Sequence, residues 1–270
     1  MSHSKKTRLY RLFEKFQCYI LVFIITPGFY VFEMSVVRPT IVDTYEIGTT
    51  KHVFHIILST FILHNVVGNM LMSIMFDSWS DKSNNDDDDD EKQCENCDVN
   101  RPKNVWHCKT CGVCVLKRDH HCFFFAKCID FRNKRYYILY LIYVTISLIY
   151  STYYNYYYVS SKFEGDMIIA AFRIINPMLR FIIPEPMGFK DLYLLFLFIN
   201  IGLAVWSGWL VVFHMKNAVR GVTAREYRST ELFKTSQWRK NLLKVFGTKW
   251  YLAIICPLVD SPLLENEKDD

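Results

Sequence analysis

Long stretches of this chain lack charged residues, and this absence argues against a soluble fold. The stretches 53–76, 136–159 and 192–213 contain no Asp, Glu, Lys or Arg, and 16–37 contains only Glu33. Each is 22 to 24 residues long, and about 20 helical residues cross the hydrocarbon of a bilayer. Because four such runs occur in one chain of 270 residues, we expect four membrane-spanning helices rather than buried soluble helices.

Other features that the sequence lacks point away from alternative classes. No small-x-small cleavage pattern follows the first apolar stretch, so we expect a retained span rather than a signal peptide. No Asn-x-Ser/Thr acceptor for glycosylation occurs, no ankyrin or SH3-like module is recognisable, and no internal repeat is evident. The net charge of +5 is explained by membrane topology, so no nucleic-acid partner is expected.

The basic residues are unevenly distributed, and their distribution predicts the orientation of the chain. Lys and Arg concentrate in the N-terminal arm, in residues 77–135 and after residue 214, whereas loops 37–52 and 161–190 have few. Four spans place the three basic regions on one side, and basic loops face the cytosol. Both termini and residues 77–135 are therefore expected in the cytosol, which keeps cysteines reduced and favours metal binding over disulfides.

Residues 94–128 hold seven of the nine cysteines and three of the eight histidines. They read Cys-x2-Cys-x9-His-Cys-x2-Cys-x2-Cys-x4-Asp-His-His-Cys-x5-Cys. A tetrahedral zinc ion takes four Cys or His ligands, so two ions need eight and two of these ten groups stay free. A free cysteine beside a histidine and an aspartate is a candidate nucleophile. The metal pattern alone also fits a cross-braced membrane ubiquitin ligase, which would not need the surplus groups.

These observations predict an all-α integral membrane protein with four transmembrane helices. A cytosolic two-zinc cysteine-rich domain lies between helices two and three. Residues 1–76 form the cytosolic N-terminal arm and helices one and two, and 77–135 form an acidic linker and the zinc-binding domain. Residues 136–213 form helices three and four with a lumenal loop, and 214–270 form a cytosolic C-terminal region. Residues 238–249 alternate apolar and basic side chains, which is typical of a helix lying on anionic lipid.

The cluster ends in Asp119-His120-His121-Cys122 beside an expected membrane span. Together with the spacing above and the four spans, this motif resembles the DHHC-type protein S-acyltransferases, also called palmitoyltransferases. The resemblance covers most of the chain and includes every position of the cysteine-rich pattern. It implies that one zinc ion binds Cys94, Cys97, His107 and Cys114, and that the other binds Cys108, Cys111, His121 and Cys128.

The resemblance also implies the roles of the remaining groups. Cys122 is the nucleophile, His120 is the general base and Asp119 orients the histidine. Cys122 would take a palmitoyl chain from palmitoyl-CoA and pass it to a cysteine of a substrate protein. The implied partners are the fatty acyl-CoA, the lipid bilayer and membrane-associated proteins with juxtamembrane cysteines, in the endoplasmic reticulum or Golgi. Four basic residues are candidates for CoA phosphates, although membrane orientation accounts for most of them: Lys127, Arg132, Lys134 and Arg135.

The chain departs from the family pattern around the catalytic motif. Phe123 and Phe124 replace the usual Pro-Trp, Lys127 replaces Asn, and Asp130 replaces Gly. Residues 223–226 read Thr-Ala-Arg-Glu where the family has Thr-Thr-x-Glu. These departures leave a second hypothesis open, a catalytically weak zinc-binding membrane scaffold with the same fold.

Overall fold

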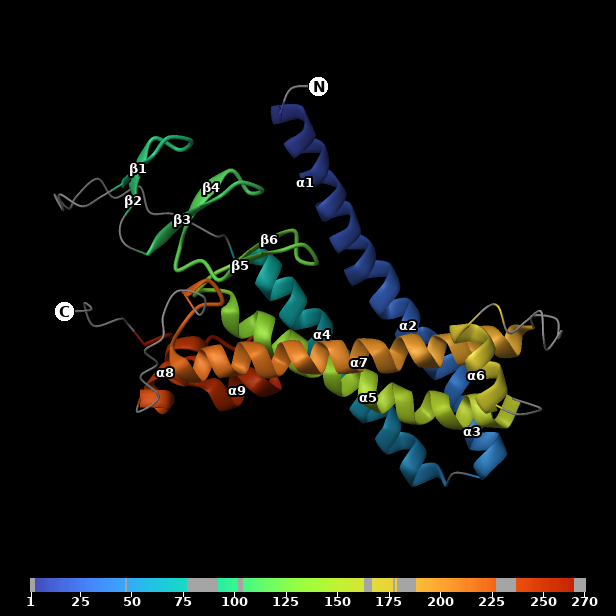
Figure 1. Ribbon diagram of the computed structural model, residues 1–270. Helices are drawn as coiled ribbons and strands as arrows, with labels where there is room; N and C mark the ends of the chain where they lie inside the picture. Colours follow the sequence, from blue (N-terminus) through green and yellow to red (C-terminus); the bar gives the residue numbers. More distant parts are fainter. Residues whose placement is uncertain are drawn as a thin grey trace. The chain divides into compact units, whose positions relative to one another are not determined.

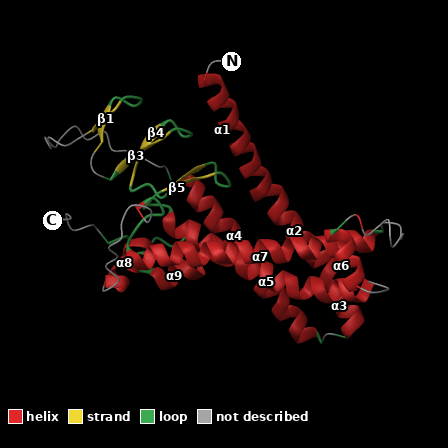
Figure 2. Ribbon diagram, in the orientation of Figure 1, coloured by secondary structure: helices red, strands yellow, loops and turns green. Residues whose placement is uncertain are grey.

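A computed structural model describes residues 3–46, 48–76, 92–101, 104–162, 167–176, 178, 188–226 and 237–264 (Figure 1). Helices make up most of the described chain, and the strands form three short pairs (Figure 2). The acidic run 86–91, expected to be a linker, lies outside the described residues.

Four long helical segments carry the apolar sequence. The first joins α1 (His3–Ile20), α2 (Thr26–Phe32) and α3 (Arg38–Tyr45) through two π-helical turns, Leu21–Ile25 and Glu33–Val37. The others are α4 (Thr49–Met75), α5 (Lys134–Lys162) and α7 (Phe189–Arg220).

All four segments are long and apolar enough to cross a membrane, which confirms the predicted spans. The helices run past the charge-free stretches because polar flanking residues continue the same backbone hydrogen bonding. Large apolar side chains cover their outer faces, as lipid contact requires: Phe54, Val205 and Trp209 are each more than 60% exposed. The chain is therefore a multi-pass membrane protein.

Three shorter helices complete the described helical structure: α6 (Met167–Ile175), α8 (Trp238–Phe246) and α9 (Trp250–Ile255). Of the amphipathic segment expected at 238–249, residues Trp238–Phe246 are helical, in α8, and the helix ends at Gly247. Its contact with lipid stays a prediction.

The cysteine-rich region folds into three antiparallel hairpins. They are β1 (Lys92–Cys94) with β2 (Val99–Arg101), β3 (Val105–Cys108) with β4 (Val113–Leu116), and β5 (His120–Cys122) with β6 (Lys127–Ile129). The buried apolar cluster of this region is small, with Cys108, Val115 and Cys128 at its centre and Cys111 packed against them.

The hairpins follow one repeating plan, contrary to the expectation that the sequence has no internal repeat. Their first strands end at Cys94, Cys108 and Cys122, at intervals of 14 residues. The repeat is hard to recognise in the sequence because the third turn lacks the second cysteine of the other two. In each turn, the fourth residue after the strand-ending cysteine has a positive φ: Asp98 (52°), Gly112 (69°) and Ala126 (51°).

The chain divides into two compact units. Unit 1 comprises Met1–Pro27, His64–Leu141 and Leu210–Asp270, and therefore holds the hairpins. Unit 2 comprises Gly28–Leu63 and Ile142–Trp209. The core of unit 2 is an apolar cluster made by α3, α5, α6 and α7 with the second π-helical turn: Val37, Ile41, Tyr158, Val159, Ala170, Leu194 and Leu197.

A buried polar network lies within unit 2. Ser151 Oγ donates to Glu33 Oε1 at 2.8 Å, and Asn155 Nδ2 donates to the same oxygen. Asn200 Nδ2 donates to Ser151 Oγ at 2.7 Å. Glu33, the single acidic residue of the expected spans, is therefore a hydrogen-bonded structural group that connects three helical segments.

Candidate metal centres and catalytic cysteine

The first group of metal ligands comes from two neighbouring hairpins. His107 and Cys114 face each other across the β3–β4 pair, and Cys94 and Cys97 come from the turn of the β1–β2 hairpin. His107 Nδ1 lies 3.2 Å from Cys97 Sγ, 3.6 Å from Cys94 Sγ and 3.9 Å from Cys114 Sγ. All four ligand atoms lie within 4.8 Å of one another.

The second group repeats this arrangement one hairpin further along. Cys108 and Cys111 come from the turn of the β3–β4 hairpin, while His121 and Cys128 face each other across β5–β6. His121 Nδ1 lies 3.2 Å from Cys111 Sγ, 3.6 Å from Cys108 Sγ and 3.8 Å from Cys128 Sγ. Each of the first two turns thus forms a ligand group with the cross-strand His–Cys pair of the next hairpin.

The spacing of these atoms fits zinc. Tetrahedral bonds of about 2.3 Å to sulfur and about 2.0 Å to nitrogen place a bound S and N roughly 3.5 Å apart. The separations of 3.2 to 3.9 Å in both groups bracket that value. All nine cysteines are free, so none of these sulfurs is used in a disulfide. Both groups are therefore compatible with zinc.

A buried carboxylate supports the second group. Glu14 on α1 is 1% exposed, and its two carboxylate oxygens each lie 3.2 Å from His121 Nε2. Because Nδ1 of this ring points at the sulfurs, Nε2 carries the proton and donates a hydrogen bond to the Glu14 carboxylate. Sequence reasoning missed this residue, although Glu14 is the single acidic residue before Glu33 in a basic arm.

Strand β5 sends the motif's side chains in two directions. Neighbouring residues of a strand point to opposite faces, so His120 and Cys122 share the face opposite to His121. Cys122 is 6% exposed. Burial raises the pKa of its thiol to about 11, while hydrogen bonds from the amides of Phe125 and Phe124 oppose that rise.

Asp119 is held by three partners in unit 1. His120 Nδ1 lies 3.0 Å from Oδ1, Lys134 Nζ lies 2.8 Å from Oδ2, and the amide of Ala224 donates to Oδ2 at 3.2 Å. Burial opposes ionisation, but the charge of Lys134 and the hydrogen bond from His120 outweigh it and hold the pKa of Asp119 below its usual range. Asp119 is therefore an ionised acceptor.

The turn after α7 supplies the amide that reaches Asp119. Gly221 has a φ of 72°, and the amides of Gly221 and Val222 donate back into the last helical turn at 3.1 and 3.0 Å. This pair of backbone hydrogen bonds forms a Schellman cap. Thr223 and Glu226 then bind each other's backbone amides, in the manner of a capping box. Ala224, which departs from the family pattern, contributes only its backbone, so the missing threonine side chain does not affect this contact.

Two aromatic residues enclose His120, and sequence reasoning missed both. Its ring meets Tyr137 edge-on at 5.1 Å between centroids and lies 5.4 Å from the ring of His214. Tyr137 Oη and His214 Nε2 are 3.3 Å apart. His214 Nδ1 lies 3.9 Å from Asp119 Oδ1, so this second histidine borders the same carboxylate.

The residues that depart from the family pattern make specific contacts in the structure. The ring of Phe123 lies 6.4 Å from Tyr10 and 6.3 Å from Phe13, both on α1. Lys127 Nζ donates to the carbonyls of Ile74, at 2.8 Å, and Phe76. The third hairpin is thereby attached to the end of α4. This contact explains why a lysine stands at position 127.

Asp130 stabilises the turn that precedes α5 through hydrogen bonds. Its Oδ1 accepts the amide of Arg132 at 2.8 Å, and its own amide donates to Asn133 Oδ1 at 2.9 Å. Asn133 Nδ2 returns to the carbonyl of Cys128 at 3.0 Å. An aspartate at this position therefore satisfies one backbone donor, the amide of Arg132, that a glycine would leave to other groups.

Three of the four basic residues considered for CoA phosphates are engaged with the protein. Lys134 pairs with Asp119, Lys127 binds the end of α4, and Arg135 Nη1 donates to the carbonyl of Ser261 at 2.7 Å. The guanidinium of Arg132 lies 5.4 Å from the neighbouring Phe131 ring. The structure therefore gives Lys127, Lys134 and Arg135 intramolecular roles.

Comparison with known proteins identifies similar sequences. The profile of the DHHC palmitoyltransferase family matches residues 87–231. Palmitoyltransferase ZDHHC22 of Danio rerio is 29% identical over 229 residues, which cover 82% of this chain and 82% of that protein. Palmitoyltransferase ZDHHC22 of Mus musculus is 26% identical over 222 residues, covering 81% and 82%. Palmitoyltransferase PFA3 of Saccharomyces cerevisiae is 47% identical over 53 residues, 20% of this chain and 16% of that protein.

Proposed function

The chain belongs to the DHHC palmitoyltransferase family and is a protein S-palmitoyltransferase, and we propose that Cys122, His120 and Asp119 carry the transfer. The observation that supports this assignment is that the two adjacent histidines of β5 have different partners. His121 points at a metal-ligand group, whereas His120 pairs with Asp119 on the face that also carries Cys122.

The contact with Asp119 determines which nitrogen of His120 can act as a base. An ionised carboxylate only accepts hydrogen bonds, so His120 Nδ1 carries the ring proton. Nε2 then holds the free lone pair and can take the proton of the Cys122 thiol. A base is needed because a thiol whose pKa is raised to about 11 by burial contains little thiolate at neutral pH.

The proposed reaction has two balanced steps. The Cys122 thiolate attacks the thioester carbonyl of palmitoyl-CoA, the bond from that carbonyl to the CoA sulfur breaks, and His120 returns the proton to the CoA thiolate. A cysteine of the substrate protein then gives its proton to His120 and attacks the acyl-Cys122 thioester. The bond from the acyl carbon to Cys122 Sγ breaks, and His120 returns the proton to that sulfur. General acid–base help of this kind contributes about 10²–10⁴-fold to the rate.

The proposed zinc ligands are the two groups described above, and bound zinc would supply folding energy to a region with a small apolar core. The proposed acyl donor is palmitoyl-CoA. The proposed acceptors are membrane-associated proteins with cysteines close to the bilayer, because the hairpins precede α5 without a long linker. The distribution of basic residues supports cytosolic termini, and we propose the endoplasmic reticulum or Golgi as the location.

Labelling with radioactive palmitoyl-CoA tests this assignment. Purified protein in detergent should gain a label that hydroxylamine removes, as expected of a thioester. Cys122→Ser should abolish the label and keep two zinc ions per chain, whereas Cys256→Ser, a change at another free cysteine, should keep both. Absence of label on the wild-type protein with two zinc ions bound would favour the catalytically weak scaffold.

A second variant separates the metal ligands from the nucleophile. Cys108→Ala removes a buried member of the second ligand group. It should lower the zinc content and the yield of folded protein. Equal misfolding of Cys108→Ala and Cys122→Ser would show instead that Cys122 is a structural ligand.

A further inference from the structure

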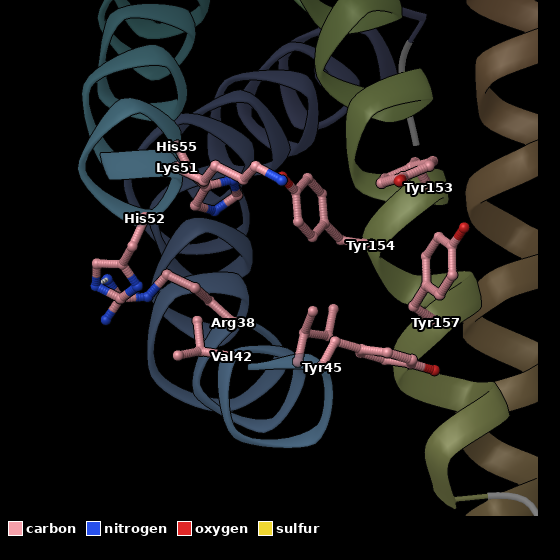
Figure 3. A pocket seen from close by; sticks show the side chains of 10 residues that line it. Arg38, Val42, Tyr45, Lys51, His52, His55, Tyr153, Tyr154 and Tyr157 are labelled. Atoms are coloured by element: carbon pink, nitrogen blue, oxygen red, sulfur yellow. Dashed lines mark hydrogen bonds between the residues drawn. The ribbon is translucent and has the colours of Figure 1, made fainter. Parts of the chain in front are cut away.

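Unit 2 contains a cavity of about 310 Å³ among α3, α4 and α5 (Figure 3). Its volume lies at the lower end of the range of about 300–1,000 Å³ that is typical of small-molecule sites. The proposed acyl transfer uses none of its residues. The lining residues are Arg38, Ile41, Val42, Tyr45, Lys51, His52, His55, Tyr153, Tyr154 and Tyr157.

The wall of this cavity carries positive charge. Arg38 comes from the start of α3 and Lys51 from the first turn of α4. Among the described residues that line the cavity, none is acidic. Figure 3 shows Lys51 and His55 extending from α4 toward Tyr154, and Arg38 extending toward His52. The cavity therefore favours an anion.

Two histidines present buried nitrogen atoms without a protein partner. Arg38 Nη1 lies 2.8 Å from His52 Nε2, and because a guanidinium only donates, the ring proton of His52 sits on Nδ1. Within the described chain, His52 Nδ1 and His55 Nε2 are buried and have no hydrogen-bond partner. His55 is itself only 8% exposed, and its other nitrogen lies 2.7 Å from Tyr150 Oη.

Membrane topology alone does not account for this arrangement. Basic residues at the ends of spans normally direct their charge to water, and interfacial tyrosines are common. Neither tendency explains a buried donor left without an acceptor, which costs about 1–3 kcal/mol unless a ligand satisfies it. Arg38 and His52 lie together on one wall of the cavity, Lys51 extends from another part of the lining, and Arg is well suited to phosphate.

We propose that this cavity binds a phosphate group, with the guanidinium of Arg38 as its main donor and the ammonium of Lys51 as a second positive charge on the wall. The apolar side chains of Ile41 and Val42 line the same cavity, which suits a group attached to an apolar chain. An anionic phospholipid supplies both parts, and free phosphate supplies only the first. From the sequence, this end of the helices is expected to face the lumenal leaflet.

Lipid binding can be measured on the full-length protein in nanodiscs of phosphatidylcholine with increasing phosphatidylglycerol, by native mass spectrometry. Wild-type protein should retain phosphatidylglycerol in preference to phosphatidylcholine. Lys51→Gln should weaken that binding at least about tenfold, because it removes a charge-assisted contact. Lys51 is exposed in the first turn of α4, so this change preserves the fold. Arg38→Gln should have an equal or larger effect.

The matched control is Lys162→Gln, which removes the same charge from an exposed position of unit 2 outside the cavity lining. It should leave lipid binding unchanged. In a parallel arm, inorganic phosphate is added to the nanodiscs that contain phosphatidylglycerol. Competition by inorganic phosphate at equal concentration would identify a soluble anion as the source. Equal lipid binding by wild type, Lys51→Gln and Arg38→Gln, or an equal loss in Lys162→Gln, would overturn the proposal.

Discussion

Replacement of Glu14 offers a sharp test of how the second metal-ligand group is built. The Glu14 carboxylate accepts from His121 Nε2 through both oxygens at 3.2 Å, from a position 1% exposed to solvent. Glu14→Gln keeps the size of the side chain and one acceptor oxygen but removes the negative charge. Glu14→Ala removes both and leaves the imidazole proton without an acceptor.

The expected loss follows from the role of such carboxylates. Removing the partner that orients a ligating histidine costs about 10–100-fold in metal affinity, which corresponds to about 1.4–2.7 kcal/mol. Because Glu14 is buried, water cannot easily replace it as the acceptor, so Glu14→Ala should lie at the upper end of this range. Glu14→Gln should lie at the lower end.

Competition with a chromophoric chelator measures this loss directly. The wild-type protein should release two zinc ions per chain at similar chelator concentrations. One of the two should leave Glu14→Gln at a concentration about 10-fold lower, and Glu14→Ala at one about 100-fold lower. The ion bound by the His107 group is an internal reference, because the Glu14 contacts involve His121. Asp260→Asn, which neutralises an exposed carboxylate of the same unit, should behave as wild type. If Glu14→Ala released both ions at the same chelator concentrations as the wild-type protein, the reasoning would be refuted.

Two further predictions concern packing and the ion pair of the proposed catalytic site. Gly68→Ala on α4 should destabilise the protein by about 1–3 kcal/mol in detergent melts, because the new methyl group would lie 2.4 Å from Pro257 Cγ. Gly202→Ala on α7, where nothing lies within 4 Å, should be neutral or stabilising, and equal effects of the two changes would contradict the packing. Asp119→Asn should lower acylation about 10²–10⁴-fold and, by leaving Lys134 without its ion partner, cost about 3–5 kcal/mol of stability. Lys134→Met in the Asp119→Asn background should restore part of the stability but none of the activity, and full acylation by Asp119→Asn would count against the proposed mechanism.

The features that depend on local sequence were predictable. Charge-free stretches identify the four spans because hydrocarbon excludes charge regardless of tertiary structure. The spacing of the cysteine-rich pattern is equally local, since one tight turn supplies both cysteines of each Cys-x2-Cys pair. The grouping of Cys94 with Cys114, or of Cys108 with Cys128, was taken from family resemblance, and the hairpin registers now give its physical basis.

Contacts between distant segments were not predictable. Glu14 and His121 are 107 positions apart, and only the tertiary fold brings α1 to the third hairpin. Lys134 was one of several basic residues beside the membrane, and its buried pairing with Asp119 depends on the start of α5. The departure at Lys127 was one of those that left a catalytically weak scaffold open, but its contacts at the end of α4 show that it attaches the hairpin.

The repeating hairpins carry a consequence for how the acyl group leaves the enzyme. The third turn ends its strand on Cys122 as the first two end on metal ligands, but Phe125 stands where they have a second cysteine. With one sulfur instead of two, this turn cannot form the thiolate pair that captures zinc. It still directs backbone amides at its sulfur, as the amide of Cys111 is directed at Cys108. Such amides oppose the rise in the Cys122 pKa that burial causes, so the turn would favour departure of the thiolate when, as we propose, the substrate cysteine takes the palmitoyl chain.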